Sequence, residues 1–90
     1  MAKGGFIEGF VYLQRVRQHR TKKGDLMAFA VGVDETAQID LVVMPSIYAR
    51  STAFLNKGQY VYFQGKMDKE DSCLVNRLQP LNTDFTQNSQ

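Results

Sequence analysis

The sequence has too few of the residues from which catalytic and metal sites are usually built. Cys73 is the only cysteine in 90 residues, so no internal disulfide can form and a zinc site made of thiolates is excluded. His19 is the only histidine, and no cysteine, aspartate or second histidine stands at metal-ligand spacing from it. General acid–base and nucleophilic catalysis therefore lack their usual participants. We expect a non-catalytic protein without metal or cofactor.

Long apolar runs are also absent. No segment approaches the roughly 20 apolar residues of a membrane helix, and no signal-peptide pattern opens the chain. We therefore expect no membrane contact. A single free cysteine fits a reducing compartment, so a cytoplasmic location is the default expectation. A chain of this length forms one small domain, whose core buries only about 60–65% of the unfolded surface.

The net charge of +2 is too small to indicate a partner, but the charges are unevenly distributed. Five of the eleven lysines and arginines lie within residues 15–23, and no carboxylate interrupts the chain between Glu8 and Asp25. Cations neutralise phosphates, and the ring of Phe29 in the apolar segment that follows could offer a flat face to a base. This pattern indicates a nucleic-acid surface. A solvated basic turn beside a core strand is the alternative that these residues leave open.

The first half of the chain predicts three strands in an antiparallel meander. Runs of β-branched and aromatic residues place these strands at 6–18, 26–33 and 38–44. A turn with Gly24, which tolerates a positive φ, joins the first two, and residues 34–37 form a tight connection to the third. Gly9 predicts a bend or bulge in the first strand.

The second half predicts a short helix and two further strands. Pro45 suits the first turn of a helix, and Gly58 is typical of the residue that ends one. Strands at 59–67, with a bend at Gly65, and at 73–79 follow, joined by a polar hairpin loop at 68–72. The folded domain should span 6–81, with a loose N-terminus at 1–5 and a disordered tail at 82–90.

This order of elements resembles the oligonucleotide-binding (OB) fold. That fold is an all-β, five-stranded Greek-key barrel, here with one short helix between strands 3 and 4. The resemblance implies a ligand face on the second and third strands, flanked by the loops at 19–25 and 68–72. The basic cluster would then lie at the rim of that face. The fold by itself does not determine the function.

Several short motifs resemble those of one OB-fold family. They are Arg-Thr-Lys-Lys-Gly at 20–24, Met-Ala-Phe at 27–29, Asp-Glu-Thr at 34–36, Pro45 with Tyr48, and Phe-Gln-Gly-Lys at 63–66. Together they are similar to the OB domain of bacterial DNA polymerase III α subunits, most of all to the Gram-positive variant, over roughly 10–81. Looser patterns occur in the anticodon-binding domains of class II aminoacyl-tRNA synthetases. Residues 31–33 depart from a usually more polar segment, and Ala37 stands where glycine is common.

The resemblance implies a module of a much larger enzyme, with single-stranded template DNA as the ligand. Other domains of the polymerase α subunit and replisome proteins are the further partners that it implies. Arg20, Lys22 and Lys23 match the family's loop and are expected to contact phosphates. The full set of candidate nucleic-acid-binding residues is Arg15, Arg17, His19, Arg20, Lys22, Lys23, Phe29, Asp40, Tyr60 and Tyr62.

The orientation of Phe29 has two interpretations. Burial by size would place the large side chains of residues 27, 29, 31 and 33 inside the barrel. The anticodon-binding relatives imply instead that Phe29 faces outward and stacks on a base, and we favour that orientation. Asp40 could accept a hydrogen bond from a cytosine amino group, or be a solvated strand residue. Tyr60 and Tyr62 could stack on bases, although cross-strand packing is the interpretation that we favour.

Two other functions remain open from the sequence. The chain could be a protein-docking module, with an apolar patch formed by Val31, Val33, Tyr60 and Tyr62. It could also be an anticodon-type reader of tRNA. Docking predicts no salt-sensitive DNA binding, whereas a tRNA reader should prefer a structured RNA loop to oligo-dT.

Overall fold

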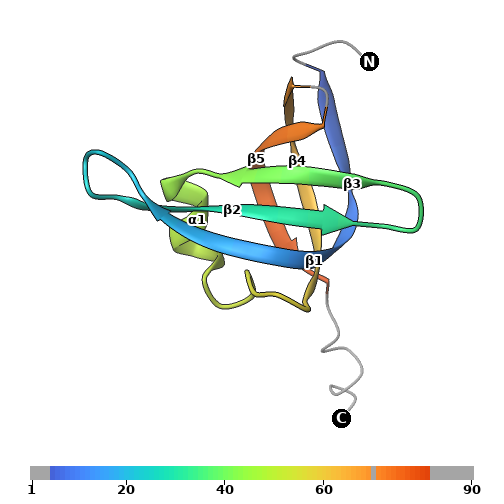
Figure 1. The fold of residues 1–90 in the computed structure, drawn as a ribbon, viewed down its shortest axis with the longest axis horizontal. Helices are drawn as coiled ribbons and strands as arrows, with labels where there is room; N and C mark the ends of the chain where they lie inside the picture. Colours follow the sequence, from blue (N-terminus) through green and yellow to red (C-terminus); the bar gives the residue numbers. More distant parts are fainter. Residues whose placement is uncertain (1–4, 70, 82–90) are drawn as a thin grey trace.

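Five strands close into a barrel in the computed structural model, which describes residues 5–69 and 71–81 (Figure 1). The elements are β1 (Phe6–Arg20), β2 (Leu26–Val33), β3 (Gln38–Val43), α1 (Pro45–Ser51), β4 (Tyr60–Lys69) and β5 (Ser72–Pro80). The predicted fold class, a five-stranded barrel with one short helix between the third and fourth strands, is confirmed. The expected disordered tail and all but the last residue of the expected loose N-terminus lie outside the described residues.

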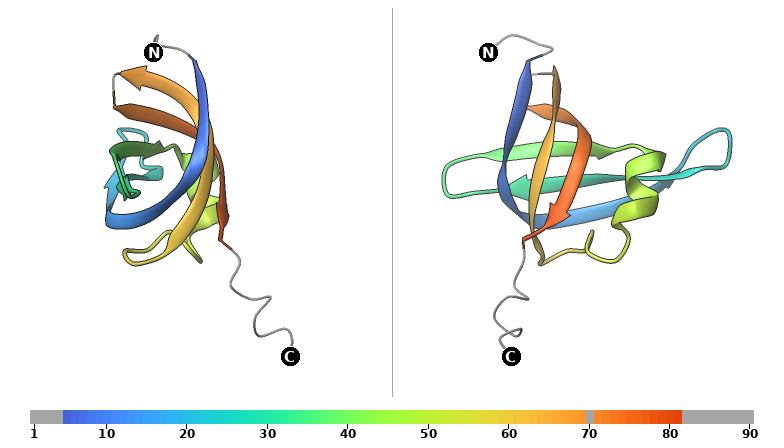
Figure 2. Two further views of the ribbon diagram at one scale, coloured as in Figure 1. Left: turned by 90° about the vertical axis from the view of Figure 1, so that its right-hand side faces the viewer. Right: turned by 180° about the vertical axis from the view of Figure 1, so that it is seen from behind.

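The long strand β1 closes the barrel by pairing with two neighbours. Its first half pairs with β4 and its second half with β2, both antiparallel, while β3 and β5 pair in parallel. The register of the β1–β2 pair shifts between Leu13 and Arg15. Such a bulge bends a strand and increases its twist. The bend lets β1 pass from one side of the barrel to the other (Figure 2).

Gly9 and Gly65 differ in strand register and in the space available for a side chain. The bulge expected at Gly9 is wrong, because Gly9 stays in register opposite Phe63, and the bulge of β1 lies at Gln14 instead. A Cβ at Gly9 would lie 3.5 Å from the Phe63 ring, an ordinary contact. The bend expected at Gly65 coincides with a register shift between Gln64 and Gly65, where a Cβ would collide with the backbone carbonyl of Leu74.

The barrel interior is narrow where β2 crosses β1. The side chains of β2 that point inward are those of Ala28 and Ala30, both buried, followed by Gly32. A Cβ on Gly32 would lie 2.7 Å from a methyl carbon of Val11, so no larger side chain fits there. The rest of the core is supplied mainly by Val11, Leu13, Leu41, Val43, Leu55, Val61, Phe63, Cys73, Val75 and Leu78.

The helix is shorter than the sequence suggested. α1 ends at Ser51, whose carbonyl accepts from the amides of Phe54 and Leu55 in the turn that follows. Gly58 does not end the helix: its amide donates to the Leu13 carbonyl in β1, with a φ of 93°. The expected helix end at Gly58 is therefore wrong, because the segment before β4 hydrogen-bonds to β1 instead of continuing the helix.

Three strands, β1, β4 and β5, are longer than predicted, and two loops are correspondingly shorter. β1 continues to Arg20, so His19 and Arg20 belong to a strand and the β1–β2 loop covers only 21–25. β4 ends at residue 69 and β5 begins at Ser72, which leaves 70–71 as the connection in place of 68–72. Both hairpins therefore extend the paired surface toward the predicted ligand rim.

Candidate nucleic-acid interface

The loop between β1 and β2 is a compact turn held by its own backbone. The Thr21 amide donates to the Asp25 carbonyl at 2.7 Å, and the Gly24 amide donates to the Thr21 carbonyl at 2.8 Å. Gly24 has a φ of 95°, which favours glycine at this position. Lys22 and Lys23 are exposed at the tip, which projects from one end of the molecule (Figure 1). The turn therefore presents two ammonium groups on a defined support.

Arg20 lies at the base of this turn. Its guanidinium donates to the Gly24 carbonyl at 2.9 Å. The side chain therefore helps to close the loop, and it adds a third positive charge beside the two lysines. The sequence did not predict that Arg20 would help to close the loop.

Three side chains of β1 share the outer face with β2. Arg15 is opposite Val31, Arg17 is opposite Phe29, and His19 is opposite Met27 in the antiparallel register. Directly opposed residues in a sheet point to the same side. Arg15, Arg17 and His19 therefore share one face of the sheet.

β3 and β5 continue the same rows. Asp40 is opposite Val31 and beside Ser72, while Val42 is opposite Phe29 and beside Leu74. One row thus runs from Arg15 through Val31 to Asp40. The next runs from Arg17 through Phe29 and Val42 to Leu74.

These rows form an open depression of about 530 Å³. Its floor is apolar, its β1 side carries Arg15 and Arg17, and its opposite side carries Asp40 and Asp68. We call this surface the β2–β3 groove. The residues that define it are Arg15, Arg17, Met27, Phe29, Val31, Asp40, Val42, Asp68, Ser72 and Leu74.

Phe29 faces outward, as we favoured from the sequence. Its side chain is 43% exposed, whereas Ala28 and Ala30 on either side are buried in the barrel. Its ring centroid lies 5.5 Å from that of His19, with the two planes inclined by 58°. The arrangement leaves part of the Phe29 ring open to solvent over the groove floor. Its stacking on a base stays a prediction.

Tyr60 and Tyr62 lie on a different sheet surface, where β4 pairs with the first half of β1. Tyr62 packs against Phe10 with ring centroids 5.3 Å apart, and Tyr60 packs against Tyr12 at 5.1 Å. The cross-strand packing that we favoured is confirmed. Neither tyrosine lines the β2–β3 groove, whereas the candidates Arg15, Arg17, Phe29 and Asp40 do. The docking patch suggested by the sequence is also divided, because Val31 lines the groove while Val33 lies beside Tyr60.

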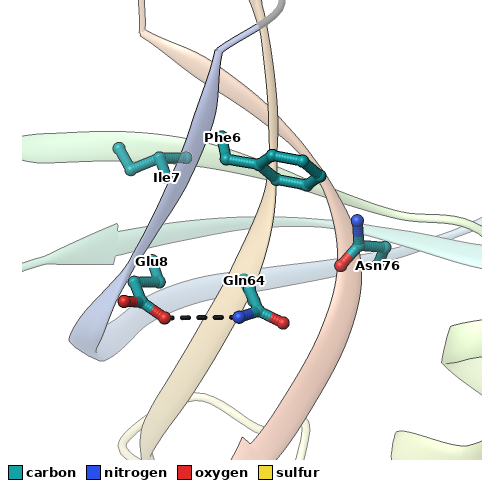
Figure 3. A pocket seen from close by; sticks show the side chains of 5 residues that line it. All are labelled: Phe6, Ile7, Glu8, Gln64 and Asn76. Carbon is teal, nitrogen blue, oxygen red and sulfur yellow. Dashed lines mark hydrogen bonds between the residues drawn. The ribbon is translucent and has the colours of Figure 1, made fainter.

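A small polar network occupies this second surface. The Tyr62 hydroxyl donates to the Glu8 carboxylate. The Gln64 amide donates to the same carboxylate at 3.3 Å (Figure 3). The hydrogen bond from Tyr62, followed by that from Gln64, lowers the pKa of Glu8 below its ordinary value. The same bond to Glu8 raises the pKa of Tyr62. The network ties β1 to β4 and involves no residue of the groove.

The described residues include one buried thiol and no cluster of metal-ligating side chains. Within residues 5–69 and 71–81, no group of three or more His, Cys, Asp or Glu is placed to hold a metal ion. Burial raises the pKa of the Cys73 thiol to about 11, so the thiol is a packing residue at neutral pH. In the same part of the chain, no helix is long and apolar enough to cross a membrane.

Sequence similarity agrees with the geometry. The chain is 36% identical to the DNA polymerase III subunit alpha of Halalkalibacterium halodurans over 80 residues, which covers 84% of this chain and 7% of that subunit. The chain is a homologue of one segment of this polymerase subunit. Its five-stranded barrel fits an OB-fold domain, so the resemblance inferred from the sequence is confirmed. The match to polymerase III alpha concerns this small barrel and not the polymerase as a whole.

Two wider comparisons add nothing to this relationship. No family model matches the chain, and no solved structure matches it.

Six of the ten groove residues were not among the binding candidates named from the sequence: Met27, Val31, Val42, Asp68, Ser72 and Leu74. Val42 could have been found, because it shares the period-two alternation of β3 with Asp40. Ser72, Leu74 and Asp68 carry no comparable local signal. Ser72 and Leu74 reach the groove because β5 lies parallel to β3, a pairing between segments about 30 residues apart.

Proposed function

We propose that this chain is a single-stranded DNA-binding module of the polymerase III alpha type, non-catalytic by itself, that binds DNA in the β2–β3 groove. The observation that carries the proposal is the distribution of apolar and basic side chains across the groove. An apolar floor with the half-exposed Phe29 ring is bordered on one side by Arg15 and Arg17, and the lysine-bearing turn extends that basic side. Few other ligands combine a polyanionic backbone with flat apolar rings.

Different residues around the groove would contact different parts of the DNA. Arg15, Arg17, Lys22 and Lys23 would neutralise phosphates along the β1 side, while a base would stack on Phe29. Stacking accepts every base, because each has a π face, so little sequence preference is expected. Asp40, on the far side of the floor, would repel phosphate and accept from an exocyclic amino group. This arrangement orients the backbone toward β1 and the bases toward β3.

The similarity to polymerase III alpha supports three further parts of the proposal. Other domains of such a subunit and other replisome proteins would be protein partners, and the location would be cytoplasmic. The similarity covers 7% of the relative's length.

The test is a titration of the 90-residue chain with fluorescent oligo-dT at several salt concentrations. Neutralising three or four phosphates should give a slope of log K against log salt of about −2 to −3. Replacing Lys22 and Lys23 by Ala should weaken binding to all sequences alike and flatten the slope by about one to two units.

The matched control removes two positive charges elsewhere, at Lys57 and Arg77, which do not line the groove. That variant should keep the salt slope of the parent protein more closely than the Lys22/Lys23 variant does. A flat salt response in the parent, or unchanged affinity after loss of Lys22 and Lys23, would contradict the proposal. Tighter binding to a structured RNA loop than to oligo-dT would favour an anticodon-type reader instead.

A further inference from the structure

A second concave surface lies at the opposite end of the molecule from the lysine-bearing turn. It is a pocket of about 480 Å³ between the first half of β1, β4 and the β2–β3 turn. Three rings line it, those of Phe10, Tyr12 and Tyr60, together with the carboxylate residues Asp34 and Glu35. None of its described lining residues is a lysine or arginine. We call it the aromatic–acidic pocket.

Two of these three rings are largely exposed to solvent. Phe10 is 60% exposed and Tyr60 is 57% exposed. The Tyr12 and Tyr60 rings meet nearly edge to face, at an interplanar angle of 61°. Edge-to-face pairing satisfies the ring edges and leaves a π face, with its negative potential, free for a partner. Large exposed rings gathered on one surface mark an interaction site more often than chance exposure does.

The two carboxylate residues are held at the rim by the turn itself. Asp34 accepts hydrogen bonds from the backbone amides of Thr36 and Ala37, both at 2.8 Å. These bonds lower the pKa of Asp34, so it is ionised at neutral pH. Glu35, the next residue, is exposed beside it. The pocket therefore combines ring faces with negative charge.

We propose that the aromatic–acidic pocket binds an arginine side chain carried by a segment of a partner protein. A guanidinium stacks flat on aromatic rings while its N–H groups remain free to reach a carboxylate, and this geometry suits arginine better than the compact ammonium of lysine. The rings supply apolar contact area for the methylene stem of the side chain. Negative charge at Asp34 and Glu35 disfavours the phosphates of a nucleic acid at this end.

The inference is independent of the proposed function. The β2–β3 groove and the aromatic–acidic pocket share no lining residue. A protein could therefore occupy the pocket whether or not DNA occupies the groove. The two sites also differ in the charge that they select.

The test uses the full 90-residue chain, labelled with ¹⁵N, and the synthetic peptide acetyl-Leu-Arg-Leu-Arg-amide as probe. The matched probes carry Gln or Glu in place of Arg. We expect chemical-shift changes at Phe10, Tyr12, Glu35 and Tyr60 with the arginine peptide and much smaller ones with the other two. Because exposed cation–π and ion-pair contacts are each worth up to about 1 kcal/mol, Glu35→Gln and Tyr60→Leu should each weaken binding about two- to fivefold.

Two controls separate this site from general charge effects. Asp25→Asn makes the same charge change as loss of Glu35 but in the β1–β2 loop, and it should leave the peptide affinity unchanged. Lys22→Ala with Lys23→Ala should also leave it unchanged. Glu35→Gln is an exposed substitution that should keep the fold, so its result stands even where Tyr60→Leu destabilises the protein.

Three results would overturn the inference. Equal shifts with the arginine and glutamate peptides would show that the pocket does not select a cation. Oligo-dT perturbing the same residues more strongly than the arginine peptide would assign the pocket to nucleic acid. Concentration-dependent self-association that broadens the Phe10 and Tyr60 signals without peptide would assign it to a second copy of the chain.

Discussion

At the scale of single residues, the orientation of Phe29 is decided by its neighbours. Ala28 and Ala30 fill the inside of β2, and the next inward position, Gly32, has no room for a side chain beside Val11. A phenyl ring could not replace these small residues without displacing β1. Phe29 is therefore exposed because the barrel is narrow, and the exposed ring becomes available for function.

Phe29→Ala should separate binding from stability. Loss of the stacking surface should weaken oligo-dT binding by roughly 1–3 kcal/mol. The melting temperature should change little, because the ring is 43% exposed and lies outside the core. Phe10→Ala removes an exposed ring outside the groove and is the matched control, which should leave DNA affinity unchanged. Unfolding of the Phe29 variant, or unchanged affinity, would contradict this role.

Glu8 and Tyr62 form a contact whose pH range can be stated. A lowered carboxyl pKa means that the contact stabilises the fold above the ordinary value of 4.5 and is lost as pH falls through the lowered value. A raised phenol pKa means that it stabilises below the ordinary value of 10.0 and is lost as pH rises through the raised value. The contact is therefore complete near neutral pH.

Tyr62→Phe should raise the pKa of Glu8 toward 4.5, because it removes the principal hydrogen bond to the carboxylate. A ¹³C NMR titration of the Glu8 carboxyl group would measure the change. Tyr60→Phe is the control, since Tyr60 packs on Tyr12 and makes no hydrogen bond to Glu8. An unchanged Glu8 titration in the Tyr62 variant would show that Gln64 alone sets the shift.

At the scale of elements, β1 contributes to both surfaces of the barrel described above. Aromatic side chains of its first half pack against those of β4, and its second half carries Arg15 and Arg17 beside β2. The bulge at Gln14 lies between these halves, where the strand changes neighbours. One continuous strand thus contributes to the aromatic–acidic pocket and to the β2–β3 groove.

The close approach of β1 and β2 makes Gly32 a sensitive position. Gly32→Ala would place a methyl group 2.7 Å from the Val11 side chain, inside ordinary contact distance. Forcing an extra carbon into a packed core typically costs about 1–3 kcal/mol. Urea unfolding of this variant should therefore show a lower midpoint.

Gly9→Ala on the same barrel is the control for that measurement. Its new methyl group would lie 3.5 Å from the Phe63 ring, where it fits without displacement. Its unfolding midpoint should stay near that of the parent protein. Equal destabilisation of the two variants would mean that strand propensity, and not the contact with Val11, limits these sites.

At the scale of the whole molecule, opposite charges lie at opposite ends. The lysine-bearing turn projects at one end of the long dimension, which measures 42 Å, and the Asp34–Glu35 turn lies at the other (Figure 1). A net charge of +2 conceals this polarity. The field around the protein would orient an approaching polyanion toward the β2–β3 groove.

Cys73 offers a reporter of global unfolding. Its side chain is completely buried in the core, and burial raises its pKa to about 11. At pH 7.5 the smaller thiolate fraction alone should slow its reaction with a disulfide reagent about a hundredfold or more relative to the unfolded chain. Reaction rates measured with and without denaturant would test this. Rapid labelling of the native protein would show that β5 opens locally from β3.

Much of the fold was predictable because its signals are local. Runs of β-branched and aromatic residues identified the strands, and Pro45 identified the start of the helix. Boundaries were less predictable where a distant partner determines them. The helix ends at Ser51 and not at Gly58 because the Gly58 amide bonds to Leu13, some 45 residues earlier.

The sequence by itself determined the order of the strands, the position of the helix, and the lysine-bearing turn at the tip of the first hairpin. These features depend on side-chain periodicity and turn chemistry within a few residues. The tertiary structure alone decided that Phe29 faces outward, that Leu74 joins the groove, and that Tyr60 and Tyr62 belong to a separate surface. The reason is that closing a barrel fixes which distant strands are neighbours and how much room remains between them, and neither quantity is encoded in any short segment.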